Sequence, residues 1–392
     1  MAAARREEIG ASAALGAHLV DVASRPAQGI HRVIADRVFG VLGPVAAPVR
    51  VVHDTVATAS YGAVRVGARC SAQMVGLVAG ALPFPRDGAA VTATAWGSVA
   101  VGAVNGLFGD RMHAEGSHLA VPFAVHERRR EVAPGAAPLR RVQPAPTGHV
   151  VVFVHGLGET EQAWWYRHGG RGSHGEQLAA LGATPVLLRY NTGRTVAENG
   201  ADLAGVLATL HRTWPVPLHR IDLVGHSMGG LVLRQACGHQ PTGTWLPLVR
   251  TACYLGTPHL GAPLAQGVHM LAGVLRHLPD TRPWAQLLDE RSAGVGDLGQ
   301  AHRLPLVDGV RHVAVAATLA SDPGRWWAGA VGDGLVTVRS ARHTGAETHV
   351  LPGTGHLALL TDPRVAQLLA ELVAWEGPPA AGSVAVPSGE RP

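Results

Sequence analysis

Apolar runs alternate with helix-like segments through the C-terminal two-thirds of this 392-residue chain. The first two runs are joined by a short Pro/Gly loop that suits an antiparallel hairpin. The later runs are separated by stretches long enough for crossover helices, which predicts a mostly parallel eight-stranded α/β sheet with flanking helices. The predicted strands are 119–127, 138–142, 149–154, 185–190, 220–225, 249–255, 312–318 and 348–351.

A helix is predicted after the last strand. Thr361 or Asp362 can cap its N-terminus, and Pro363 suits its first turn. Its apolar face consists of Val365, Leu368, Leu369 and Leu372. Residues 377–392 are rich in Pro, Gly and Ser, which predicts a disordered tail.

Residues 1–116 show a different pattern and predict a separate helical region before a body at 117–376. Residues 88–109 carry no charge and are long enough to span a bilayer, but they are mostly small. A buried or surface-lying helix is therefore favoured, with peripheral membrane contact as the minority alternative. Helical spacing of apolar residues indicates amphipathic helices packed on one another or on the body, at Ile30, Val33, Ile34, Val38 and Val41, and at Val49, Val52 and Val56.

Charge and cysteine content narrow the functional classes. The net charge is +5, and the one tight basic cluster, residues 128–130, is interpreted as a solvated face, so no nucleic-acid partner is expected. Three distant cysteines give neither a disulfide framework nor metal-ligand spacing. Two acids follow the first basic pair with no apolar core behind them, which argues against a secretory signal. We expect a cytoplasmic protein, with membrane association as an alternative.

One motif stands out in the body. Residues 225–230 read Gly-His-Ser-Met-Gly-Gly, after an apolar run and before a helix-like run. This context predicts a strand, a sharp turn and a helix, with Ser227 at the apex. Gly225 and Gly229 lack a Cβ, so the backbone can turn tightly and approach its neighbours closely. Ser227 is therefore the candidate nucleophile.

An acid and a base follow Ser227 in the order that this chemistry uses. Asp333 lies between the last two predicted strands, and Asp322 is the second choice for the acid. His356 follows the last strand and is chosen from 22 histidines by its position. His356 would accept the proton of Ser227, and Asp333 would orient the imidazole. Neither a metal nor an organic cofactor is required.

A glycine-rich turn after strand 149–154 supplies the candidate oxyanion loop. The proposed donors are the backbone amides of Leu157 and Met228, the latter directly after the nucleophile. His155, Gly156 and His226 are the candidate substrate-binding residues. An ordinary βα turn is the alternative interpretation. His259, after the sixth strand, is expected to support its loop.

Several motifs resemble those of the α/β-hydrolase superfamily. Residues 255–263, Leu-Gly-Thr-Pro-His-Leu-Gly-Ala-Pro, are similar to the L-G-T-P-H-x-G-[SA]-P segment of bacterial triacylglycerol lipases and GPI inositol-deacylase-like hydrolases. Residues 333–336 resemble the acid-bearing D-G-x-V motif of that group, and residues 155–158 resemble its oxyanion loop. The resemblance covers about residues 117–376. Residues 190–193, 198–200 and 291–298 are similar to segments of an actinobacterial esterase subgroup.

The resemblance implies an esterase or lipase that acts on an acyl ester or lipid through an acyl-enzyme on Ser227. Residues 261–300 lie where this superfamily commonly inserts a lid, and ordinary helix packing on the sheet is weighed equally. An acyltransferase or thioesterase using the same three residues is an alternative. A third is a membrane- or granule-surface binding protein whose hydrolase body is inactive.

Overall fold

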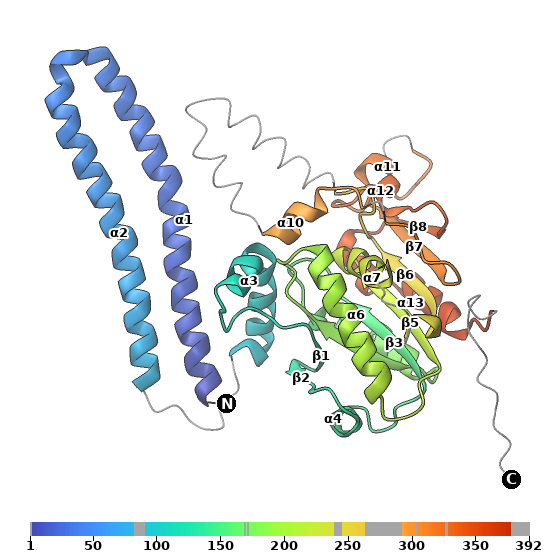
Figure 1. The fold of residues 1–392 in the computed structure, drawn as a ribbon. Helices are drawn as coiled ribbons and strands as arrows, with labels where there is room; N and C mark the ends of the chain where they lie inside the picture. The colour runs from blue at the N-terminus through green and yellow to red at the C-terminus, as the bar shows by residue number, and fades with distance from the viewer. Residues whose placement is uncertain are drawn as a thin grey trace, which may run out of the picture.

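The computed structural model describes residues 2–81, 91–167, 170, 172–238, 245–262, 292–302, 304–325 and 328–377. An eight-stranded sheet forms the centre of the C-terminal body (Figure 1). The strand order is β2-β1-β4-β3-β5-β6-β7-β8, with β1 antiparallel to both neighbours and every other pair parallel. This is the α/β-hydrolase fold that the sequence predicts. The strands are β1 (Ala124–Glu127), β2 (Arg130–Glu131), β3 (His149–Val154), β4 (Thr184–Arg189), β5 (Arg220–His226), β6 (Val249–Leu255), β7 (Arg311–Thr318) and β8 (Glu347–Pro352).

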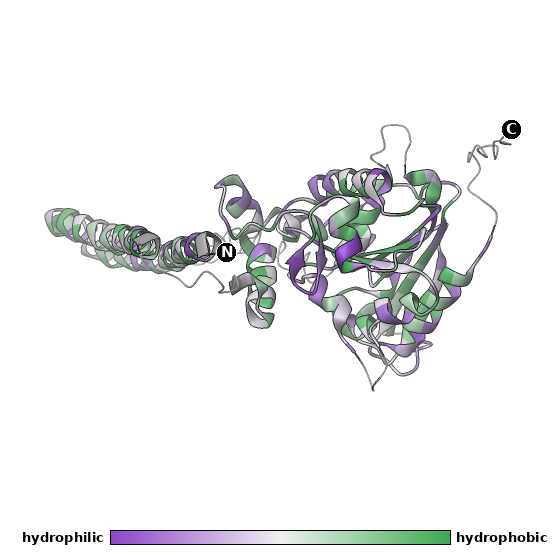
Figure 2. Ribbon diagram, turned by 90° about the horizontal axis from the view of Figure 1, so that it is seen from below, coloured by the Kyte–Doolittle hydropathy of each residue, from purple (hydrophilic) through white to green (hydrophobic). Residues whose placement is uncertain are grey.

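Helices cover both faces of the sheet, because its central strands are apolar on both sides. In β3, Val150 and Val152 belong to a core under α6 and α7, whereas Val151 and Phe153 belong to a core under α5 and α13. Figure 2 shows the apolar strands between these helical layers. The helices of the body are α4 (Ala136–Val142), α5 (His174–Ala179), α6 (Val196–Thr213), α7 (Met228–Gly238), α10 (Ala293–Leu298), α11 (Ala328–Val331), α12 (Val338–Ala341) and α13 (Pro363–Ala374), with short 3₁₀ turns η3 (Glu161–Trp165), η4 (Leu246–Leu248) and η5 (His356–Leu360).

The final helix is confirmed. Asp362 caps α13 by accepting a hydrogen bond from the Arg364 amide, and Pro363 is the first helical residue. The predicted apolar face is buried. The proposed disordered tail lies almost entirely outside the described residues.

The prediction of a strand at 138–142 is wrong. These residues lie in α4, where Leu139 is the buried residue. The hairpin partner of β1 is instead Arg130–Glu131, reached through Arg128 and Arg129 at positive φ. The strand predicted at 119–127 is shortened to its last four residues.

The N-terminal region is helical, as predicted. Helices α1 (Ala2–Leu42) and α2 (Ala47–Ala81) form an antiparallel hairpin around the 3₁₀ turn η1 (Pro44–Ala46), and this hairpin projects from the body (Figure 1). A short turn, η2 (Val91–Ala93), leads into α3 (Ala95–Ala114), which holds much of the uncharged stretch at 88–109. None of the described helices combines the length and hydropathy needed to cross a membrane.

One face of α3 is buried against the body. It consists of Ser98, Val101, Gly102, Asn105, Gly106, Gly109 and Met112. A Cβ on Gly102 would lie 2.8 Å from the carbonyl oxygen of Glu159, and one on Gly106 would lie 3.0 Å from Gly158 Cα. The small residues of α3 therefore let its backbone approach the loop that follows β3.

Candidate active site

Ser227 occupies a strained turn between β5 and α7. Its φ of 52° lies in the left-handed region, which costs a residue with a side chain about 1–2 kcal/mol. The turn is held by the Ser227 amide, which donates to the carbonyl of Leu255 at 2.8 Å, and by the Gly230 amide, which donates to Ser227 O at 3.1 Å. Strain that the surrounding structure maintains is typical of functional positions.

The glycines around Ser227 are required by close packing, as the sequence predicts. A Cβ on Gly225 would lie 2.6 Å from the Gly230 nitrogen. A Cβ on Gly229 would lie 2.3 Å from the Val154 carbonyl oxygen. Helix α7 therefore begins directly against the end of β3, beside the candidate oxyanion loop.

Asp333 and His356 form a buried pair. His356 Nδ1 donates to Asp333 Oδ2 at 2.7 Å, and the His356 amide donates to Asp333 O at 3.0 Å. The other carboxylate oxygen, Oδ1, accepts from the amides of Leu335 and Val336 at 2.9 and 2.8 Å. These bonds fix the carboxylate and place the proton on Nδ1, which leaves Nε2 as the basic nitrogen. The alternative acid, Asp322, is exposed and bonds to the Gly324 amide.

Ser227 and the His356 ring flank the start of the loop after β6. Leu255 accepts from the Ser227 amide, and a Cβ on the next residue, Gly256, would lie 3.1 Å from His356 Nδ1. Within the described part of the chain, neither Ser227 Oγ nor His356 Nε2 has another hydrogen-bond partner.

The loop after β3 leaves one amide unused. The Gly156 amide donates to Glu159 Oε2 at 2.7 Å, and the Gly158 amide donates to Thr192 Oγ1 at 3.0 Å. The amide of Leu157 between them donates to none of the described residues, and neither does the amide of Met228, the first residue of α7. These are the two donors that the sequence predicts. Gly156 itself lies against the nucleophile, because a Cβ there would be 3.0 Å from Ser227 Cβ.

The side chain of His155 is fully buried and does not face a substrate. Its ring stacks on Tyr190 at 4.5 Å, Nδ1 donates to Gly156 O, and the Tyr190 hydroxyl donates to His155 O at 2.8 Å. Burial lowers the pKa of His155 to about 4, so the ring is neutral. His155 therefore supports the loop rather than binding substrate with its side chain.

His226 is also fully buried, and its partner is a residue that the sequence did not single out. Its Nδ1 donates to Glu159 Oε2 at 3.1 Å, and its Nε2 donates to the carbonyl of His356 at 3.2 Å. Burial opposes the imidazolium, but the Glu159 carboxylate outweighs it and raises the pKa of His226. Burial also opposes the Glu159 carboxylate, yet His226 lowers the pKa of Glu159 to about 2.

Glu159 thus joins two parts of the site. One carboxylate oxygen holds both the Gly156 amide of the oxyanion loop and the ring of His226, and His226 in turn holds the backbone of His356. The available signal in the sequence was an acid directly after a glycine-rich turn. Its partner lies 67 positions further along the chain.

His259 supports the loop after β6, as expected. Its buried ring accepts from Arg234 Nη1 at 3.0 Å, and its amide donates to Ser340 O at 2.9 Å. Burial, followed by the charge of Arg234, lowers the pKa of His259 to about 2. This neutral histidine is therefore a structural residue.

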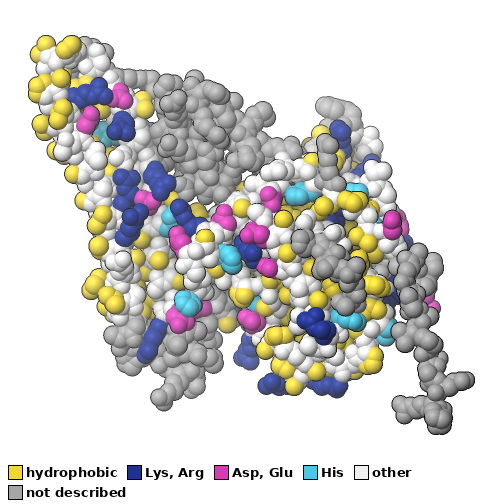
Figure 3. Space-filling view, viewed as in Figure 1, with side chains coloured by type: hydrophobic (Ala, Val, Ile, Leu, Met, Phe, Trp, Pro, Cys, Tyr) yellow, Lys and Arg dark blue, Asp and Glu magenta, His cyan; other side chains and the backbone are white. Residues whose placement is uncertain are grey.

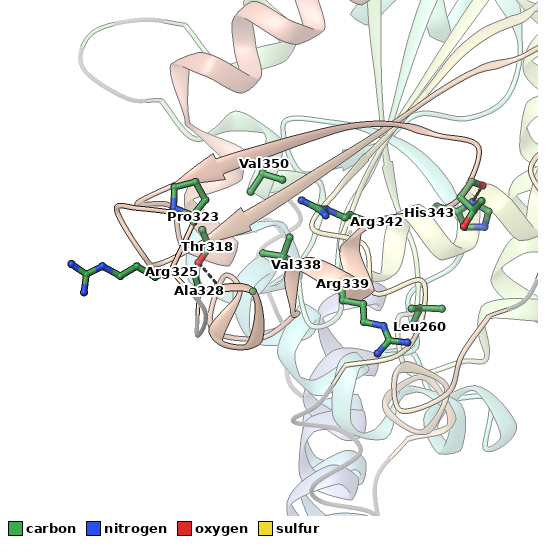
Figure 4. Close-up of a pocket in the computed structure, with 13 residues that line it drawn as sticks. Leu260, Thr318, Pro323, Arg325, Ala328, Val338, Arg339, Arg342, His343 and Val350 are labelled. Atoms are coloured by element: carbon green, nitrogen blue, oxygen red, sulfur yellow. Dashed lines mark hydrogen bonds between the residues drawn. The ribbon is translucent and has the colours of Figure 1, made fainter.

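A pocket of about 920 Å³ opens between α11, α12 and the ends of β7 and β8 (Figure 4). Three arginines line it, but their guanidinium groups point in different directions and do not converge: Arg325, Arg339 and Arg342. None of Ser227, Asp333 and His356 lines this pocket. Most of the segment interpreted as a lid, residues 263–291, lies outside the described residues. No group of three metal-ligating side chains occurs in the part of the chain that is described.

The strand order, the strained serine after β5 and the Asp–His pair beyond β7 and β8 are arranged as in the α/β-hydrolase fold. Residues 193–302 match the family model of the PGAP1-like alpha/beta domain. This segment contains the turn at Ser227 and the motif at 255–263, and the match agrees with the resemblance found in the sequence.

Several of the solved structures similar to this chain are lipases or esterases. The Bacillus licheniformis lipase BlEst2 in its mature form is 21% identical over 57% of this chain and 91% of its own, with a TM-score of 0.42. A metagenomic carboxyl esterase is 21% identical over 62% and 78%, with a TM-score of 0.39. A lipase-esterase related protein from Clostridium acetobutylicum is 16% identical over 58% and 95%, with a TM-score of 0.35. The comparison with curated proteins gave no significant match.

Proposed function

We propose that this protein is a serine hydrolase that cleaves carboxylic esters. The observation that carries the proposal is the strained Ser227 together with the buried Asp333–His356 pair, which leaves Nε2 of the histidine unprotonated. A serine hydroxyl needs such a base to become a nucleophile at neutral pH.

The reaction would proceed in two stages. Ser227 Oγ attacks the ester carbonyl while His356 Nε2 accepts its proton, and the amides of Leu157 and Met228 donate to the oxyanion. His356 then protonates the departing alcohol, which leaves an acyl group on Ser227. Water, deprotonated by His356, attacks this acyl-enzyme, and His356 then returns the proton to Ser227 Oγ as the carboxylic acid is released. Asp333 stabilises the imidazolium in both stages.

The test is hydrolysis of p-nitrophenyl esters from acetyl to palmitoyl by the purified chain. We expect Ser227→Ala to abolish turnover and labelling by a fluorophosphonate, whereas Ser321→Ala, an exposed serine on the loop after β7, keeps both. Turnover at the wild-type level in Ser227→Ala would refute the assignment.

The chain-length optimum also separates the substrate classes. A short-chain optimum indicates an esterase, and a long-chain optimum indicates a lipase. No turnover of any ester would contradict the proposal and favour acyl transfer to another acceptor or a binding role.

A further inference from the structure

The α1–α2 hairpin has an inverted distribution of polar and apolar side chains. Several of its charged groups pair across the line where the two helices meet. Asp21 on α1 is buried and pairs with Arg25 at 2.7 Å, and it also lies 3.8 Å from Arg65 and 3.9 Å from Arg69 of α2. Burial opposes the Asp21 carboxylate, but these arginines outweigh it and lower the pKa of Asp21.

Further polar contacts continue along this seam. Arg50 of α2 pairs with Asp36 of α1, Arg65 donates to Gln28 at 2.7 Å, and His31 contacts His53 with their Nε2 atoms 3.2 Å apart. In a helical hairpin whose surroundings are water, the apolar side chains occupy this position instead. Here charged groups pair with one another where the two helices meet, with Asp21 buried and the Arg50–Asp36 pair about half exposed.

The outward face of α2 is almost uncharged. The formally charged residues within 47–79 are Arg50, Asp54, Arg65 and Arg69. Arg50 and Arg65 pair with acids of α1, and Asp54 pairs with Arg50 one turn away, so these three lie on the side of α2 that meets α1. Figure 3 shows apolar and uncharged side chains along the outer edge of the hairpin, with the charged ones lying inward. The turn at Val45 is 92% exposed, and the large apolar side chains exposed on α2 are Val49, Val51, Val52, Val56, Val64, Val66, Met74, Val75, Leu77 and Val78.

Two hydroxyl groups on this face are bonded within their own helix. Thr55 Oγ1 donates to Val51 O at 2.7 Å, and Ser60 Oγ donates to Val56 O at 2.8 Å. Such bonds back to the preceding turn satisfy a hydroxyl within its own helix, which is what an apolar environment demands. These two hydroxyls therefore need no hydrogen-bonding partner from the surroundings of the helix.

We propose that the hairpin binds a lipid surface, with the outward face of α2 among the acyl chains and headgroups. A lipid phase fits better than a second copy of the chain, because the uncharged surface covers most of the circumference of α2, and a partner helix would cover only a narrow stripe. Charged groups in such a phase are paired with one another, as they are in the α1–α2 seam. The hairpin is joined to the site through α3, because His18 of α1 contacts Phe108 of α3, and α3 packs on the oxyanion loop.

The first test is cosedimentation of the full chain with phosphatidylcholine vesicles. These vesicles have no net charge, so binding to them does not come from electrostatic attraction to anionic lipid. The Ser227→Ala background keeps the lipid intact and separates binding from hydrolysis. We expect the triple variant Val52→Gln, Val56→Gln, Leu77→Gln to lower the partition coefficient at least about tenfold, because three apolar groups leave the lipid. The matched control is Leu181→Gln, at an exposed leucine on the body, which should bind like the parent.

The second test uses Cys70, which is exposed on α2, whereas the other two cysteines are buried. Burial raises the pKa of Cys237 and Cys253 to about 12, so a fluorophore reacts selectively with Cys70. We expect an environment-sensitive dye there to shift to the blue on adding vesicles. Melting curves by circular dichroism check that the triple variant remains folded.

Three results would overturn the proposal. They are equal binding by the triple variant and its parent, no binding by either with an unshifted dye, and a stable oligomer in light scattering that the triple substitution dissociates. The last result would assign the face to a second copy of the chain. All of them leave the ester assay unaffected, so failure here is distinct from failure of the proposed hydrolysis.

Discussion

Glu159→Gln tests whether the carboxylate behind the oxyanion loop positions the site. The substitution keeps an oxygen that can accept from the Gly156 amide, but it removes the charge that faces His226. His226 then loses its ionic partner while it still has to hold the His356 carbonyl. We expect the loop and the His356 backbone to loosen together.

The magnitude follows from the charge-assisted hydrogen bond that is lost. Such a bond contributes about 1.5–3 kcal/mol, which corresponds to a fall of roughly 10- to 150-fold in kcat/KM if it is realised in the transition state. We expect most of the fall in kcat, since Glu159 holds the backbone around the oxyanion donor and does not bind the acyl chain. Glu159→Asp should recover part of the loss, and Glu371→Gln, at an exposed acid on α13, is the matched control.

The same pair makes a pH-dependent contribution to stability. The pKa of Glu159 is lowered from 4.5 to about 2, which amounts to about 3 kcal/mol of preference for the folded carboxylate. This contribution is present above the unfolded pKa and is lost as the pH falls through the folded value of about 2. The pKa of His226 is raised, so its contribution is present below 6.5 and is lost as the pH rises through the folded value.

The difference in melting temperature between the wild type and Glu159→Gln should therefore be largest between about pH 4.5 and 6.5 and should shrink at higher pH. Melting curves by circular dichroism at several pH values, together with steady-state kinetics on a short-chain p-nitrophenyl ester, measure both effects. Wild-type kcat and an unchanged melting temperature in Glu159→Gln would refute the positioning role.

Three further substitutions probe the other contacts. Asp333→Asn should lower kcat by about four orders of magnitude with little change in fold, because the amide favours the wrong imidazole tautomer; esterase kinetics beside a melting curve check this, and retention of activity would exclude Asp333 as the acid. Gly102→Val should lower the free energy of unfolding by about 1–3 kcal/mol and lower kcat, since its Cβ would meet the carbonyl oxygens of Glu159 and Gly158 at 2.8 and 2.9 Å. The control Gly205→Ala, where an added Cβ has no atom within 4 Å, should raise the free energy of unfolding by about 0.5–1 kcal/mol. Urea unfolding measures both. Arg189→Met should cost about 3 kcal/mol or more, because it leaves buried Glu161 without the guanidinium that donates to it at 2.8 Å, and the double variant with Glu161→Gln should recover part of that loss.

The body could be predicted from the sequence where local and long-range signals agree. The runs at 149–154 and 220–225 are apolar on both sides, which is what a strand between two helical layers requires. The prediction at 138–142 overlooked that Leu139 and Val142 are three positions apart, which is helical spacing and not the alternation of a strand. The true hairpin strand, Arg130–Glu131, is two charged residues and gives no hydrophobic signal.

The site was predictable in its order but not in its supporting contacts. Ser227, Asp333 and His356 follow one another in a recognisable sequence context, and the structure brings the last two together. The role of Glu159 depends on which ring its carboxylate reaches in space. The direction in which the apolar side chains of the hairpin face also could not be predicted from the sequence. Helical spacing reveals an apolar stripe but not whether that stripe faces the partner helix. Contacts such as Arg65 with Asp21 decide this, and they join residues far apart in the chain.

Helix α3 connects the hairpin to the site through direct contacts on both of its sides. Towards the hairpin, Phe108 packs edge-on against His18 with ring centroids 5.5 Å apart, and Arg111 donates to the same ring at 2.7 Å. Towards the body, Ser98 accepts from Arg189 at 2.8 Å, and the glycine face leaves no room between α3 and the oxyanion loop. Packed interfaces of this kind resist sliding, because a shift of a few tenths of an ångström already produces overlap. Helix α3 therefore lies between the hairpin and the oxyanion loop, and under the two proposals it is the element that joins a lipid-bound hairpin to the body.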